Sequence, residues 1–161
     1  GSIIFQEKEP IHENDTAGTL YERLMKKGAQ LVLKTVNGIE AGNYPSVPQE
    51  ESPEIKHAPK IFKETCEIKW DQPSERVRNF VRGLSPYPSA WSILAGKNYK
   101  VFEVTLADKE GNGRHPGYIH TDNKNYLYIK TSDGWISIEE LQPEGKRKMN
   151  IKDFFRGNKE D

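Results

Sequence analysis

Hydrophobic and polar residues follow different periods in successive parts of the chain. Between Ile3 and Pro10 they alternate one by one, which predicts a strand that ends at the proline. From residue 16 to residue 37 the apolar residues instead recur every three or four positions, at Leu20, Leu24, Leu31, Val32 and Val36. This spacing predicts one long helix with an apolar stripe on one face.

Sequence signals also mark the two ends of this helix. Asp15 or Thr16 is placed to accept hydrogen bonds from the free amides of the first turn. Asn37-Gly38 supplies the left-handed residue that commonly ends a helix. Because one strand and one helix cannot enclose a core, we expect residues 3–39 to be the tail of a larger domain.

A linker and a second helix follow. Residues 40–59 contain four prolines and show no periodicity, so we expect an extended linker. The second unit starts at residue 60. Residues 73–84 predict a helix that Asp71 caps, with Val77, Phe80 and Val81 on its inward face.

From Trp91 onward the period becomes twofold. Short alternating runs cover residues 91–94, 99–106, 117–120, 125–130 and 135–141, and turn residues separate them at 96–97, 122–123 and 132–134. These five strands predict a small antiparallel barrel or sandwich. Asn150 and Asp153 flank the start of a short closing helix, so the fold class is α+β and mainly β.

Composition adds a weak charge asymmetry. Residues 1–59 hold 6 Lys+Arg against 9 Asp+Glu, and residues 60–161 hold 18 against 15. This excess fits a polyanionic partner and equally fits an ordinary solvated surface. No run approaches the roughly 18 apolar residues of a membrane span, and no signal peptide is visible, so we expect a cytoplasmic protein. The single cysteine, Cys66, is expected to be a small buried apolar residue.

The residues by themselves do not make an active site. The loop that begins at Asp108 resembles a calcium loop through Glu110 and Asn112, but Ile119 stands where a bidentate carboxylate is required. His115 and His120 lack the further ligands of a zinc site. The cluster His12, Glu13 and Asp15 is better explained by helix capping than by catalysis. No nucleophile elbow or phosphate-binding glycine loop is present.

Cations of the second unit are the remaining candidates. On a small barrel, turns and loop ends can share one rim and follow a phosphate backbone, whereas solvated loops carry such residues without any partner. The candidate positions are Lys60, Lys63, Arg82, Lys97, Lys100, Lys124, Lys130, Lys146, Arg147 and Lys148.

Several stretches resemble a known family. HENDTAGTLYERLMKKGA, HAPKIFKETCEIKW, VRNFVRGLSPYPSAW and LQPEGKRKM are similar, in order and spacing, to the second half of the methionyl-tRNA formyltransferase family. The resemblance spans residues 3–157. In that family an amino-terminal doubly wound α/β domain transfers a formyl group from formyl-tetrahydrofolate to the methionine carried by initiator tRNA. A carboxyl-terminal OB-like barrel helps to hold the tRNA.

The resemblance divides the chain and assigns its parts. It implies a remnant of the catalytic domain at residues 3–39, a linker at 40–59 and an OB-like tRNA-binding domain at 60–158. The family's catalytic Asn, His and Asp lie before the equivalent of Ile3, so no catalytic, cofactor-binding or metal residue is assigned here. We expect this fragment to be inactive alone and formyl-tetrahydrofolate to serve only the parent enzyme.

The implied partner is initiator methionyl-tRNA, bound by the ten cations above. The parent is expected to be monomeric, and the front segment of the present chain to fold back on the barrel, to self-associate or to fray. The alternative is a structural or interdomain module of another folate-dependent formyltransferase, or of a formyl-tetrahydrofolate hydrolase or dehydrogenase, in which no tRNA is handled.

Overall fold

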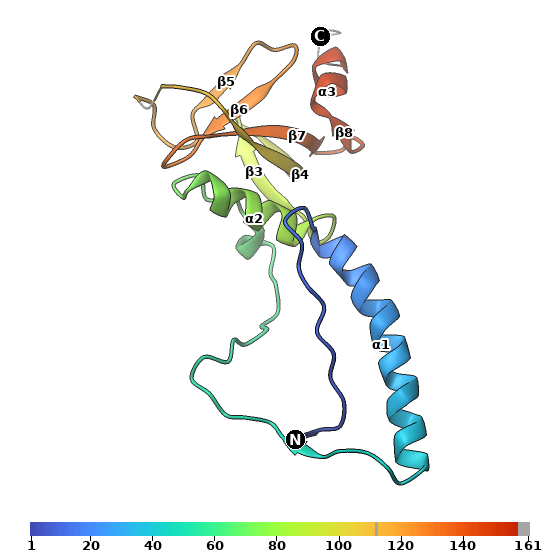
Figure 1. Cartoon of the computed structure of the whole chain (residues 1–161). Coiled ribbons are helices and arrows are strands. Elements are labelled where there is room, and N and C mark those ends of the chain that lie inside the picture. The colour runs from blue at the N-terminus through green and yellow to red at the C-terminus, as the bar shows by residue number, and fades with distance from the viewer. Residues whose placement is uncertain (112, 158–161) are drawn as a thin grey trace. The chain divides into compact units, whose positions relative to one another are not determined.

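The chain consists of two compact units, residues 1–60 and residues 61 onward. Figure 1 shows a computed structural model that describes residues 1–111 and 113–157. Asn112 of the calcium-like loop and residue 158, the expected end of the second domain, lie outside the described residues. No helix within the described ranges is long and apolar enough to cross a membrane.

The first unit contains much less strand than the alternation predicts. β1 spans only Ser2–Ile3 and pairs antiparallel with β2, Val47–Pro48. The expected strand up to Pro10 is therefore wrong. The physical reason is the partner: β2 offers two residues, and its proline has no amide hydrogen with which to continue a ladder.

The long helix is present; its expected start is confirmed, and its end lies beyond the expected Asn37-Gly38. α1 spans Ala17–Glu40. Thr16 caps it: the Thr19 amide donates to Thr16 Oγ1 at 3.2 Å, and the Thr16 amide donates to Thr19 Oγ1 at 2.9 Å. The helix continues through Gly38 to Glu40. The glycine at position 38 allows the backbone of Asn43 to approach closely. The Asn43 amide donates to the Gly38 carbonyl at 2.9 Å, and a Cβ at Gly38 would meet the Asn43 oxygen at 3.2 Å.

The second helix, α2, spans Ser74–Leu84 and follows the short 3-10 turn η1 at Glu64–Cys66. Asp71 does not cap it. Pro73 occupies the N-cap position, and the free Ser74 amide donates to Asp133 Oδ1 at 2.8 Å. Asp133 lies in the turn before β7, 59 residues away along the chain. The helix start therefore depends on the folded sheet.

Six antiparallel strands form the sheet of the second unit. They are β3 Ala90–Leu94, β4 Lys97–Ala107, β5 Ile119–Thr121, β6 Leu127–Lys130, β7 Trp135–Pro143 and β8 Met149–Asn150. The order is β3-β4-β7-β6-β5, and β8 pairs with β7. The five expected strands are confirmed, and β8 is the one that the pattern missed. Figure 1 shows the sheet strongly curled, in the manner of a half-barrel.

An irregularity in β4 allows the sheet to curl over its core. The β4–β7 register shifts between Val101 and Val104, so both of these valines are buried although they are three residues apart. A bulge of this kind bends a strand and increases its twist. A strictly alternating strand would have exposed one of the two.

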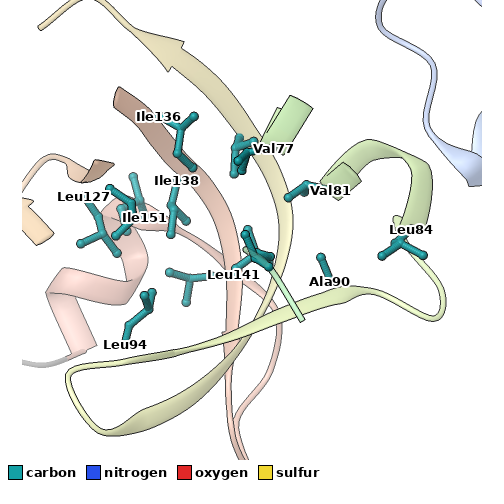
Figure 2. Packing of buried hydrophobic residues seen from close by; sticks show 14 of the residues in the cluster. Val77, Val81, Leu84, Ala90, Leu94, Leu127, Ile136, Ile138, Leu141 and Ile151 are labelled. Atoms are coloured by element: carbon teal, nitrogen blue, oxygen red, sulfur yellow. The ribbon is translucent and has the colours of Figure 1, made fainter. Parts of the chain in front are cut away.

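The core lies between α2, the concave sheet and α3, which spans Ile151–Gly157. Figure 2 shows Val77 of α2 close to Ile136 of β7, Leu84 beyond Ala90 at one end of the cluster, and Leu127 and Ile151 at the opposite end. Cys66 is 2% exposed and belongs to this cluster, so its assignment as a buried apolar residue is confirmed. Asn150 caps α3 by accepting from the Asp153 amide at 2.9 Å.

Candidate functional site

Strand pairing brings two basic segments together at one end of the sheet. In the antiparallel pair β4–β7, Tyr99 lies opposite Pro143 and Lys100 opposite Gln142. The turn before β4 and the loop after β7 therefore share one edge. Ala95 and Gly96 form that turn with φ of 48° and 78°, as a two-residue hairpin requires. The Lys146 amide donates to the Pro143 carbonyl at 3.1 Å and closes the loop.

A groove of about 630 Å³ opens between these two segments and α3. We call it the loop groove. Lys97, Lys146 and Arg147 contribute three cations to its wall, and Tyr99 and Phe154 contribute aromatic rings. The two rings meet edge to face, with centroids 5.8 Å apart. The groove thus combines positively charged and aromatic side chains in its lining.

A second groove of about 540 Å³, the tryptophan groove, lies beside it. Lys63 and Lys100 line it together with Phe62, Tyr87 and Trp91. Trp91 holds the two lysines near each other. Its indole Nε1 donates to the Lys63 carbonyl at 2.8 Å, Lys63 Nζ lies 5.8 Å from the ring centroid, and Trp91 pairs with Lys100 across β3 and β4.

The two grooves are continuous, because Asn98, Pro143 and Glu144 line both. Together they present five cations, which we call the basic rim: Lys63, Lys97, Lys100, Lys146 and Arg147. Among the described residues, two acids line the same surface, Glu144 and Asp153. Asp153 is engaged by Arg156 at 3.3 Å and by Asn150 at 2.9 Å. The local excess of positive charge is well suited to an anionic chain.

Lys148 behaves differently from its two neighbours in sequence. Its Nζ forms an ion pair with Glu140 at 2.8 Å and lies 4.6 Å from the centroid of the Phe102 ring. It lines neither of the two grooves. Of the three consecutive cations, two therefore belong to the basic rim, and the third is held against the sheet by a carboxylate and an aromatic ring.

Lys130 has to be removed from the candidate set. It is 2% exposed, and its Nζ donates to the carbonyls of Thr131 at 2.8 Å and Gly134 at 3.2 Å. A buried ammonium that already donates to two carbonyls cannot reach a phosphate on the surface. Alternation places Lys130 on the face of β6 that carries Tyr128, opposite Ile129. It is nevertheless buried, because its Nζ lies 5.9 Å from the centroid of the Trp135 ring and donates to carbonyls of the turn before β7.

The other candidate cations are dispersed. Lys124 lines a separate shallow groove of about 170 Å³ with Lys152 and Arg156 of α3. Sequence reasoning missed these last two, although their spacing of four residues on the closing helix was a usable signal. Lys60 and Arg82 are not among the described residues that line the two main grooves. Arg82 Nε donates to Asn79 Oδ1 at 2.7 Å along α2.

The histidines and acids outside the rim have other structural partners. His120 lies in an aromatic cluster 5.5 Å from Tyr126, and His115 packs against Tyr118 at 6.0 Å. No three His, Cys, Asp or Glu side chains within the described residues are arranged to hold a metal ion. Asp15 accepts from the guanidinium of Arg23 at 2.7 Å and from the His12 amide, and the Arg23 contact holds its pKa well below its usual range. It stays ionised as a structural anion.

Comparison with known proteins gives a consistent picture. Residues 60–159 match the family described as formyl transferase, C-terminal domain. The chain is 41% identical to the methionyl-tRNA formyltransferase of Azobacteroides pseudotrichonymphae genomovar. CFP2, covering 98% of this chain and 52% of that protein. It is 40% identical to that of Chlorobium limicola, with 98% and 50% coverage. The chain thus spans about half the length of the curated relatives it matches.

Solved structures share the fold. HypX from Aquifex aeolicus superimposes with a TM-score of 0.66 at 22% identity, covering 94% of this chain and 27% of HypX. WlaRD, a sugar 3N-formyl transferase crystallised in the presence of dTDP and 5-N-formyl-THF, gives 0.61 at 25% identity and covers 91% of this chain and 51% of its own. The fold of this chain therefore occurs in HypX and in a sugar formyl transferase.

Proposed function

The chain belongs to the formyl transferase family, whose C-terminal domain it carries, and from this premise we propose that it is the tRNA-holding half of a methionyl-tRNA formyltransferase. The parent enzyme would move a formyl group from formyl-tetrahydrofolate to the amino group of methionine on initiator tRNA, in the cytoplasm. Formyl-tetrahydrofolate is a substrate of that reaction, and we assign no residue of this chain to it.

The chemistry explains why such a half is useful. Acyl transfer to an amine needs the amine neutral and the developing oxyanion stabilised by fixed donors. The reacting amine sits at one end of a bulky polyanion, so attraction for phosphates far from the reaction can place it. Binding energy collected at the basic rim is thereby converted into orientation of the amine.

The observation that supports this role is the basic rim itself. Five cations and two acids line one continuous surface, and one of those acids is already engaged within the protein. Phosphates that bind there would release counterions, so the affinity would fall steeply with salt. For the isolated chain we expect weak binding, on the order of tens of micromolar, because few phosphates are contacted.

The direct test compares four ligands over a salt series: initiator tRNA, elongator tRNA, duplex DNA and an uncharged polymer of similar size. We expect salt-dependent binding of both tRNAs and none of the polymer. Binding that does not change with salt, or no tRNA binding at low salt, would overturn the proposal. A preference for the initiator would show that this half also discriminates between tRNAs.

The second candidate is an interdomain module that does not contact tRNA. It is favoured by the sugar-modifying WlaRD, which carries the same fold. One comparison distinguishes the two candidate functions: the tRNA affinity of the chain before and after the cations of the basic rim are neutralised. Equal affinities would support the interdomain module.

We also propose that this chain pairs with a second copy of itself through α1. The helix has no fully buried residue, and apolar side chains along it are exposed, among them Val32 and Leu33 at 63% each. Burying such side chains is worth about 25 cal/mol per Å². Sedimentation over a range of concentrations should show a dimer that Leu33→Glu abolishes, and a strict monomer at high concentration would contradict the pairing.

A further inference from the structure

Tyr87 is the most exposed large hydrophobic side chain among the described residues, at 85%. It stands on the loop between α2 and β3, at the mouth of the tryptophan groove. A tyrosine offers a ligand both a large apolar face and a hydroxyl that can hydrogen-bond, and here almost the whole side chain is available for such contact. No hydrogen bond or ring contact of the folded chain accounts for it within the described residues.

The loop that carries this ring is anchored at both ends. Prolines stand on both sides of Tyr87, and each fixes its own φ angle. Ser85 and Ser89 are buried at the two ends, and the Ser89 amide donates to the Leu84 carbonyl at 2.8 Å. The ring therefore projects from a short and anchored loop. A loop anchored in this way loses little backbone entropy when its side chain binds a ligand.

The surroundings indicate what the ring meets. Phe62 is 54% exposed and lines the same groove, and Trp91 forms part of its wall. Lys63 already lies over the Trp91 ring, so Tyr87 presents the more open aromatic face. Lys63 and Lys100 bring two positive charges to the same groove. Aromatic faces between cations are the combination that binds single-stranded nucleic acid, in which rings stack on bases and cations follow the phosphates.

We propose that the tryptophan groove receives an unpaired nucleotide of the bound RNA, with its base stacked on Tyr87 and its phosphates beside Lys63 and Lys100. This inference rests on the proposed function, in which the chain binds RNA. The tryptophan groove continues into the loop groove through Asn98, Pro143 and Glu144. It adds a contact that pure charge attraction lacks. A base–ring contact needs an unstacked base, so paired RNA alone cannot make it.

The test uses three probes of equal phosphate number: a short single-stranded RNA, the same strand with abasic sugars, and a duplex RNA. The proteins are the full chain, Tyr87→Ala, and Tyr87→Phe as the matched control that keeps the ring. Because Tyr87 is so exposed, none of these variants should unfold the protein. Stacking is lost in Tyr87→Ala alone, and we expect it to bind the single strand about 5- to 20-fold more weakly. Tyr87→Phe should stay within about twofold.

Two readouts separate this inference from the function on which it rests. The salt slope should be unchanged in Tyr87→Ala, because the phosphate contacts remain, and the abasic strand should bind wild type and Tyr87→Ala equally. If wild type binds none of the probes, the proposed function fails. If wild type binds with a steep salt slope and Tyr87→Ala binds the single strand equally well, only the stacking assignment fails.

Discussion

Neutralising the β7–β8 loop tests whether the basic rim holds RNA. Lys146→Ala combined with Arg147→Ala removes two of its five cations. Each neutralised phosphate contributes about −0.7 to −0.9 to the slope of log affinity against log salt. If all five cations are engaged, the wild-type slope is roughly −3.5 to −4.5, and the double variant retains about −2 to −3.

These slopes translate into a difference that is easy to measure. Over an about fourfold rise in salt, wild type should lose roughly 100- to 500-fold in tRNA affinity and the double variant only about 20- to 40-fold. Fluorescence anisotropy with labelled tRNA at several sodium chloride concentrations gives both slopes. Thermal unfolding should be nearly unchanged, since both side chains are exposed.

Lys148 supplies the matched control. It is adjacent in sequence and has the same charge, but it lies against Phe102 and pairs with Glu140. Lys148→Ala should therefore leave the salt slope close to wild type. If Lys148→Ala lowers the slope as much as a single substitution at Arg147, then net charge matters and the position of the charge does not. An unchanged slope in the double variant would refute the assignment of the loop altogether.

Three further substitutions probe the charges and the fold. Glu144→Gln removes the acid shared by both grooves, and tRNA should bind about two- to threefold more tightly at low salt in a titration. Asp133→Ala deletes the cap of α2 and should cost about 1–2 kcal/mol in urea unfolding. The Ser74 amide lowers the Asp133 pKa, so the stability from this contact is present above about pH 4 and is lost as the pH falls below it. Asp133→Ala should therefore lose less stability in acid than wild type does, and an equal acid dependence of the two proteins would contradict the assignment. Lys130→Met should lower stability by about 1–3 kcal/mol in the same assay and leave the salt slope of tRNA binding unchanged. A reduced slope would show that Lys130 contacts a phosphate.

Local signals predicted most of the elements. The three-to-four spacing of α1, the inward face of α2 and the five alternating strands all follow from side chains that must share one face of their own element. Errors occurred where an element depends on a partner distant in sequence. The first strand shrank to Ser2–Ile3 because its partner is short, and α2 receives its cap from Asp133 and not from the nearby Asp71.

The candidate site, too, was predictable from the sequence only in part. A list of cations can be read from the chain, and the loop around Lys146 is conspicuous there. Which of them act together is a matter of register: Tyr99 opposite Pro143 places Lys97 beside Arg147, and Trp91 opposite Lys100 adds Lys63. The folded structure also determines that Lys130 is buried and that Lys148 pairs with Glu140.

The order of residues alone thus indicated the family, most of the secondary-structure elements and the surplus of positive charge in the second unit, because these depend on residue type and short-range spacing. The long-range pairing of β4 with β7 decided the remainder. Charge acts over about one Debye length, roughly 10 Å, so cations far apart along the chain become one binding surface only when the folded sheet places them side by side.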